Sequence, residues 1–120
     1  MAELSPHLIR PLSGSHNFQR VLAARLQKRS GAIKVAVASN RAGFPRVGFA
    51  IRGVNSAVLR NRVRRRLRAA LRSTVAPPLD VVVMADARVA SVAFATLQQD
   101  MKSAIGAAAD LIGAGAYEAS

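Results

Sequence analysis

The sequence lacks cysteine and tryptophan, and aromatic residues make up only 4% of its 120 positions. Without cysteine, the protein has no disulfide bond, no cysteine-bound zinc and no thiol nucleophile. No apolar run reaches the length needed to cross a membrane. Two prolines interrupt residues 1–14, which contain no signal-peptide core. We therefore expect a cytoplasmic protein, and the 51% of hydrophobic residues suffice for one domain with its own core.

Acidic residues are scarce and unevenly placed. Six Asp and Glu stand against eighteen Lys and Arg, which gives a net charge of +12. Between Leu4 and Leu79 there is no acidic residue, although sixteen of the eighteen basic residues lie there. Such a surface suits a polyanion, because neutralising phosphates releases their condensed counterions. Fifteen of the cations are arginines, whose planar guanidinium group binds phosphate bidentately and stacks on bases.

Hydrophobic periodicity predicts six elements in the order α-β-β-α-β-α, within a single domain at residues 15–112. An irregular arm is predicted for residues 1–14, because prolines and a glycine interrupt it, and a flexible tail is predicted for 113–120. We expect the first two strands to pair antiparallel, since a short loop joins them. The predicted elements are a helix at 15–29, strands at 31–40 and 45–53, a helix at 54–74, a strand at 79–86 and a helix at 91–112.

The predicted helix at 54–74 contains seven arginines between Arg60 and Arg72 and no acidic residue. At about 100° per residue, its apolar residues form one arc that packs on a sheet. Arg60 falls on this apolar side, so its side chain must extend past the core or point into a neighbouring cleft. The opposite arc carries Asn61, Arg62, Arg65, Arg68 and Arg72. A solvated helix face normally alternates acids with bases, so this face favours polyanion binding over simple exposure to solvent. A membrane-surface helix is the weaker alternative, because the apolar arc lacks Trp and Phe anchors.

Catalytic motifs are absent from the sequence. It contains no G-x-S-x-G, H-E-x-x-H or Walker loop. The basic region has no carboxylate to bind the metal ions of a two-metal nuclease. The isolated residues His7 and His16 do not form a metal site. If the protein takes part in phosphodiester chemistry, the metal ions are therefore held elsewhere.

The stretch RVGFAIRGVNSAVLRNRVRRRLRAALR, followed by LDVVVMA, resembles the protein component of bacterial ribonuclease P. The matching features are R-V-G at 46–48, A-V at 57–58, R-N-R at 60–62, the basic residues Arg64, Arg65 and Arg68, Asp80 at the start of a strand, and NFQRV around Phe18. The resemblance spans about residues 15–105. The sequence departs from the family pattern in its shortened IRGVNSAV turn, where Arg52 is the sole cation, and in its fewer aromatic residues.

This resemblance implies an α+β fold, a single-domain sandwich with a central mixed sheet and helices. It also implies a left-handed β-α-β crossover, as in ribosomal protein S5 domain 2-like folds, which is an exception to the right-handed rule. The implied function is that of a non-catalytic subunit in the ribonucleoprotein endonuclease that removes 5′ leaders from precursor tRNA. The catalytic RNA would hold Mg²⁺ and perform the hydrolysis. The implied partners are this RNA and the 5′ leader, with no membrane and no small-molecule substrate.

The resemblance and the charge pattern together predict one set of RNA-binding residues. The arginine-rich helix would contact the catalytic RNA, and Phe18 with the sheet cleft would hold the leader. From its spacing alone, Phe18 is either a core residue or, if exposed, a platform for a nucleobase. The predicted residues are Phe18, Arg46, Arg52, Arg60, Asn61, Arg62, Arg64, Arg65, Arg66, Arg68 and Arg72. The alternative function is that of a stand-alone RNA-binding or ribosome-associated protein without a role in tRNA processing.

Overall fold

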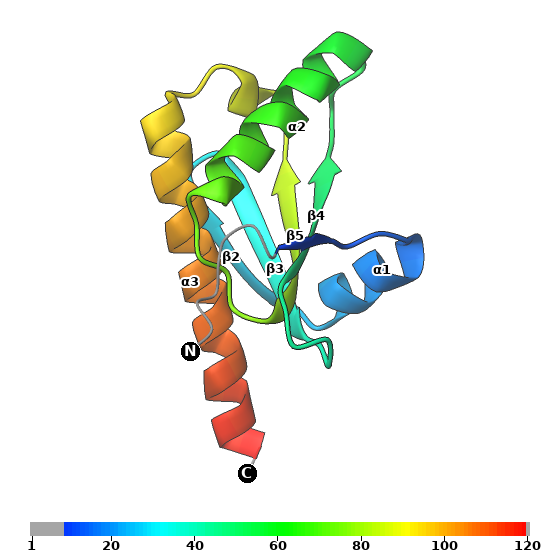
Figure 1. Ribbon diagram of the computed structural model, residues 1–120, viewed down its shortest axis with the longest axis vertical. Helices are drawn as coiled ribbons and strands as arrows, with labels where there is room; N and C mark the ends of the chain where they lie inside the picture. The colour runs from blue at the N-terminus through cyan, green and yellow to red at the C-terminus, as the bar shows by residue number, and fades with distance from the viewer. Residues whose placement is uncertain (1–8, 120) are drawn as a thin grey trace.

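A mixed five-stranded sheet with the strand order β1-β4-β5-β3-β2 forms the centre of the computed structural model, which describes residues 9–119 (Figure 1). Helices α2 and α3 pack on one face of this sheet, and α1 packs on the other. The elements are β1 (Arg10–Pro11), α1 (Ser15–Ala23), β2 (Leu26–Ser30), β3 (Ile33–Ser39), β4 (Arg46–Ile51), α2 (Ala57–Arg72), β5 (Leu79–Ala85), the 3-10 helix η2 (Ala87–Ala90) and α3 (Phe94–Ala119).

Strand β5 lies between β3 and β4, antiparallel to β3 and parallel to β4. The prediction that the strands at 31–40 and 45–53 pair with each other is therefore wrong. A short loop favours a hairpin only when no better partner is available. The valines at 81–83 of β5 are buried on both faces, as expected for a central strand, and the position between β3 and β4 gives β5 a partner on each edge.

The connection from β4 through α2 to β5 is left-handed. Seen from the side of α2 with both strands pointing upward, β5 lies to the left of β4 (Figure 1). Most parallel crossovers have the opposite hand. The expected α+β class, mixed sheet and left-handed crossover are thus confirmed.

The two faces of the sheet carry different side chains, because alternate residues of a strand point in opposite directions. Branched residues of the strands form the main core beneath α2 and α3, together with Val63, Leu67, Leu97, Met101 and Ile105 of the helices. The face beneath α1 carries the small residues Ala36 and Ala38, on which Val21 and Phe18 pack. The alanines allow α1 to lie close to the sheet.

The predicted helix at 15–29 is too long. Helix α1 ends at Ala23, Arg25 adopts a φ of 59°, and the chain continues as β2. Strand β2 pairs with β3 along its whole length, and Gly31 with a φ of 57° makes the turn between them. The helix-like spacing of Leu26 is overridden by this pairing, which directs Leu26 onto the main core.

The ends of the chain also differ from the predictions. Within residues 9–14, Arg10 and Pro11 form the short strand β1 and pair in parallel with Arg46 and Val47, whereas the other four residues belong to no helix or strand. The rest of the predicted arm, residues 1–8, lies outside the described residues. Helix α3 continues to Ala119, where a flexible tail was predicted. Within residues 9–119, no helix is both long enough and apolar enough to cross a membrane.

Candidate nucleic-acid interface

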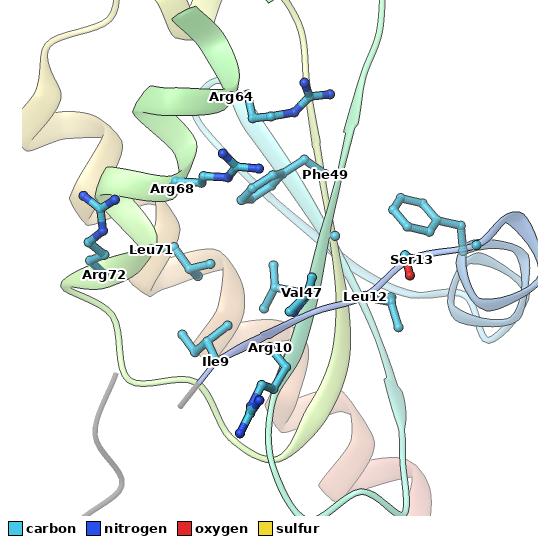
Figure 2. A pocket seen from close by; sticks show the side chains of 14 residues that line it. Ile9, Arg10, Leu12, Ser13, Val47, Phe49, Arg64, Arg68, Leu71 and Arg72 are labelled. Carbon is cyan, nitrogen blue, oxygen red and sulfur yellow. The ribbon is translucent and has the colours of Figure 1, made fainter. Parts of the chain in front are cut away.

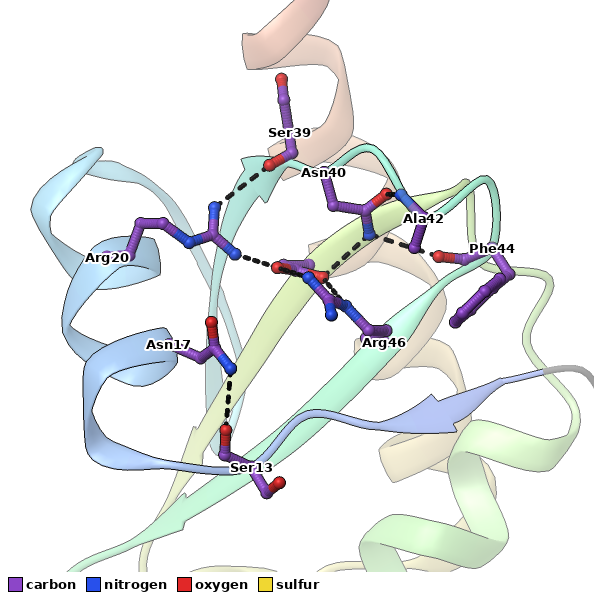
Figure 3. Close-up of polar contacts among 9 residues, drawn as sticks. Ser13, Asn17, Arg20, Ser39, Asn40, Ala42, Phe44 and Arg46 are labelled. Carbon is purple, nitrogen blue, oxygen red and sulfur yellow. Dashed lines mark hydrogen bonds and ion pairs between the residues drawn. The ribbon is translucent and has the colours of Figure 1, made fainter.

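A buried carboxylate at the start of β5 joins three segments of the chain. The side chain of Asp80 is fully buried, and Arg46 binds both of its oxygens at 2.7 Å. Asn40 donates a third hydrogen bond at 2.8 Å, and Arg20 of α1 donates a fourth. Figure 3 shows Arg20, Asn40 and Arg46 converging on this point from different elements. Arg46, a predicted RNA-binding residue, therefore forms an ion pair inside the protein.

The ionisation of Asp80 depends on the balance between burial and hydrogen bonding. Burial raises the pKa of this carboxyl, but the hydrogen bonds from Arg46, Asn40 and Arg20 outweigh it, and the pKa lies below its ordinary value. The hydrogen bond to Asp80 in turn raises the pKa of Arg46. Both groups are therefore charged at neutral pH, and the pair fixes the starts of β4 and β5 side by side.

The arginines of α2 point in three directions rather than lying on one polar face. Its first turn is capped by Ser56, whose Oγ accepts from the N–H of Leu59 at 3.2 Å. Asn61, Arg62 and Arg65 are exposed on the outer side of the helix. Arg64, Arg68 and Arg72, each four residues apart, line a cavity at the sheet edge. The outward arc predicted from the sequence is thus divided, because Arg68 and Arg72 lie on the cavity side.

Two arginines of α2 are bound to the protein itself. Arg66 donates to the carbonyl oxygens of Ala90 at 2.9 Å and Val92 at 2.5 Å, and its guanidinium lies 5.9 Å from the ring centre of Phe94. Arg60 donates to the carbonyl oxygen of Val54 at 2.7 Å, so it turns back to the loop before the helix. Arg60 thus ties α2 to the loop before it, and Arg66 ties α2 to the segment that follows β5.

The cavity lies between β1 and α2 and has a volume of about 750 Å³ (Figure 2). Its apolar lining includes Ile9, Val47, Phe49 and Leu71. Its basic lining comes from Arg64, Arg68 and Arg72 of α2 together with Arg10 of β1. Among residues 9–119, no acidic residue lines it. The cavity thus combines apolar surface with an unbalanced positive charge.

Phe18 is neither fully buried nor fully exposed. Its ring packs against the smaller core and lies over Gly48, where an added Cβ would overlap the ring. Phe18 also lines one end of the cavity. Phe18 is therefore a residue of the smaller core that also borders the cavity, and its role as a platform for a nucleobase stays a prediction.

Sequence reasoning missed Phe49 as a residue that lines the cavity. Phe49 follows Val47 on the same face of β4, and it points toward α2 near Arg64 and Arg68 (Figure 2). The alternation of PRVGFAIRG places Phe49 on the same face of the strand as Val47. It does not predict a cavity there, because β1 forms part of the cavity wall. Arg52, at the end of β4, has an exposed side chain, while its backbone N–H donates to Ala85 at 2.9 Å.

Comparisons with known proteins agree with this fold. The family model of ribonuclease P matches residues 9–109. A Staphylococcus aureus RNase P protein mutant with defective mRNA degradation activity superposes with a TM-score of 0.67 at 18% identity, covering 80% of this chain and 85% of that chain. The RNase P protein from Thermotoga maritima gives a TM-score of 0.63 at 20% identity, covering 77% of this chain and 91% of that chain. A search of curated proteins gives no match.

Proposed function

Because the chain belongs to the ribonuclease P family, we propose that it binds the catalytic RNA of ribonuclease P and the 5′ leader of precursor tRNA during 5′ maturation. Its task is to assist an endonucleolytic cleavage that the RNA performs. The observation that carries this proposal is the charge of α2. Five of its arginines have no hydrogen-bonding partner among residues 9–119, and these are Arg62, Arg64, Arg65, Arg68 and Arg72.

The arginines would act by lowering the repulsion between two RNA molecules. Guanidinium groups on one rigid helix neutralise neighbouring phosphates, and the release of counterions favours the assembly. Because Arg60 ties α2 to the loop before it and Arg66 ties α2 to the segment after β5, the remaining arginines are presented at fixed spacing. Arg52 and the half-buried Phe18 are proposed to contact the leader on the side of α1.

We assign the Mg²⁺ ions of the reaction to the RNA. Residues 9–119 bring together no group of three His, Cys, Asp or Glu side chains that could hold a metal ion. Asp80, the fully buried carboxylate, is saturated by its four donors. In this proposal, the residues of this protein bind and orient RNA, and the partner RNA performs the phosphodiester chemistry.

Cleavage of precursor tRNA by a catalytic RNA at low Mg²⁺ tests the proposal. Adding the protein should raise the cleavage rate, because its arginines replace part of the ionic screening. A variant with both Arg62→Ala and Arg65→Ala, which loses two outward charges, should raise it less. Binding to these RNAs without any gain in cleavage, across several cognate catalytic RNAs, would instead favour a stand-alone RNA-binding protein.

A further inference from the structure

The cavity between β1 and α2 has the size and chemistry of a ligand site. Its volume of about 750 Å³ lies within the range of about 300–1,000 Å³ that is usual for small-ligand pockets. Phe49 points from β4 into the space between the strand and α2, close to Arg64 and Arg68 (Figure 2). Leu71 and Val47 continue the apolar surface beside it. An aromatic ring of a ligand can therefore pack on Phe49.

The basic lining selects the charge of the ligand. Arg64, Arg68 and Arg72 repeat every four residues along α2, and none has a hydrogen-bonding partner within residues 9–119. The fourth cation is Arg10, whose guanidinium lies 5.7 Å from the ring centre of Phe44 and makes a cation–π contact with that ring. Three guanidinium groups on one side of an apolar cavity favour a phosphate attached to an aromatic body.

The edge of β4 adds hydrogen-bonding groups to the same cavity. Strand β1 pairs with β4 only at Arg46 and Val47, so the ladder stops before Phe49. The carbonyl of Val47 faces this outer edge, because it accepts from Leu12 at 3.0 Å. Backbone groups of alternate residues point to the same edge, so the N–H and C=O of Phe49 also face outward. A base edge can pair with this donor and acceptor.

From these three observations, we propose that the cavity binds one unstacked nucleotide of an RNA strand. The base packs on Phe49 and pairs with the open edge of β4, while its phosphate lies against Arg68 and Arg72. This inference rests on the proposed function, since the catalytic RNA would supply the nucleotide. It adds that the cavity beside α2 contacts a base as well as a phosphate, and that the side of α2 with Arg68 and Arg72 faces this nucleotide.

Titration of the full chain with adenosine 5′-monophosphate, followed by nuclear magnetic resonance, tests the cavity directly. Ribose 5-phosphate is the matched ligand, because it has the phosphate and lacks the base. We expect adenosine 5′-monophosphate to bind about fivefold tighter or better, as one stacking contact provides, and to shift the amide signals of Val47, Phe49 and Leu71. Equal affinity for the two ligands would overturn the proposal.

Two variants locate the binding. Arg68→Ala should weaken the binding of adenosine 5′-monophosphate, whereas Arg65→Ala, which removes the same charge from the outer side of α2, should not. Phe49→Leu keeps an apolar side chain in the core but removes the flat aromatic surface, so the advantage over ribose 5-phosphate should disappear. An equal loss from Arg65→Ala and Arg68→Ala would show non-specific attraction and would reject the site.

Competition with RNA identifies the source of the nucleotide. Saturating catalytic RNA should displace adenosine 5′-monophosphate, and ultraviolet crosslinking should join the peptide that contains Phe49 to one RNA position. Retention of the mononucleotide beside bound RNA would refute the assignment to RNA. The cleavage assay distinguishes the two proposals. If the protein raises the cleavage rate but binds adenosine 5′-monophosphate and ribose 5-phosphate equally, the cavity proposal alone is rejected. If the protein prefers adenosine 5′-monophosphate but does not raise the cleavage rate, the proposed function alone is rejected.

Discussion

Asp80 shows how one residue can decide the register of a sheet. It lies opposite Arg46 in the pairing of β5 with β4, and it also receives hydrogen bonds from Asn40 and Arg20. Arg46 and Asp80 were both recognised in the sequence, one as an RNA-binding residue and the other as a strand start. Their partnership was not predicted, because 34 positions separate them along the chain. In the structure, these two residues form one ion pair that holds the starts of β4 and β5 together.

We predict that Asp80→Asn lowers the free energy of unfolding by about 2–3 kcal/mol, because it leaves Arg46 without its counter-charge in a partly buried position. Denaturation with urea, monitored by circular dichroism, measures this change. Asp86→Asn is the control, since the pair of Asp86 with Arg88 is solvent-exposed and contributes little. Equal effects of the two substitutions would contradict the role of Asp80 as an anchor.

The pH dependence of stability follows from the same group. The pKa of Asp80 is lower in the folded protein than in the unfolded chain, so its contribution is complete above the ordinary carboxyl value of about 3.9. It is lost as the pH falls through the lower pKa of the folded state. Urea denaturation between about pH 6 and pH 2 should therefore show a steeper loss for the natural sequence than for Asp80→Asn.

At the scale of elements, α2 has three functions on its three sides. Its apolar side packs on the sheet through Val63 and Leu67, one flank is tied to η2 by Arg66, and the third side presents guanidinium groups that have no hydrogen-bonding partner within residues 9–119. The sequence showed that the helix was too basic to be an ordinary surface helix. Only the structure shows which of its arginines bind other parts of the protein.

We expect Arg65→Ala and Arg66→Ala to have different consequences. Arg65→Ala should weaken RNA binding and reduce the slope of log affinity against log salt by about 0.7–0.9, because one phosphate contact is lost. Arg66→Ala should mainly lower the free energy of unfolding, by about 1–3 kcal/mol, since two carbonyl groups lose a charged donor. Filter binding at several salt concentrations and urea denaturation measure the two quantities. Identical profiles for the two variants would argue against the division of α2.

The contact between α1 and β4 gives another prediction at this scale. A Cβ at Gly48 would overlap the ring of Phe18 and come within 2.7 Å of the Leu12 carbonyl oxygen. Gly48→Ala should therefore lower the free energy of unfolding by about 1–3 kcal/mol. Gly106→Ala on α3 is the control, because an added Cβ there would meet no atom of another segment within 4 Å among residues 9–119, and alanine favours a helix. A neutral effect at Gly48 would mean that α1 is free to move away from the sheet.

At the scale of the whole molecule, the sequence predicts what local signals determine. The basic helix was predicted at 54–74 and lies at Ala57–Arg72, because Ser56 caps it and Pro77 follows it closely. Strand β2 was missed, because its residues become a strand only by pairing with β3. The cavity was missed for a similar reason, since β1 joins the sheet through a pairing that residues 10–11 do not reveal on their own. The handedness of the crossover came from the family resemblance alone.

The net charge of +12 leads to a prediction for the free protein. Because like charges repel one another within the fold, raising the salt concentration from about 0.05 M to about 0.5 M should raise its melting temperature. Differential scanning calorimetry measures this rise, and the doubly substituted Arg62→Ala, Arg65→Ala variant should show a smaller one. A melting temperature that falls with salt would mean that internal ion pairs, rather than repulsion, dominate the stability.

The position of β5 in the middle of the sheet has a consequence for synthesis on the ribosome. Strands β3 and β4 are made early, but they have no direct contact to form, and the strand that joins them begins at Leu79. The emerging chain therefore carries two unjoined halves of a sheet while all seven arginines of α2 leave the exit tunnel. Folding must await the segment that brings Asp80, so the order of translation delays the tertiary structure until the basic helix is complete.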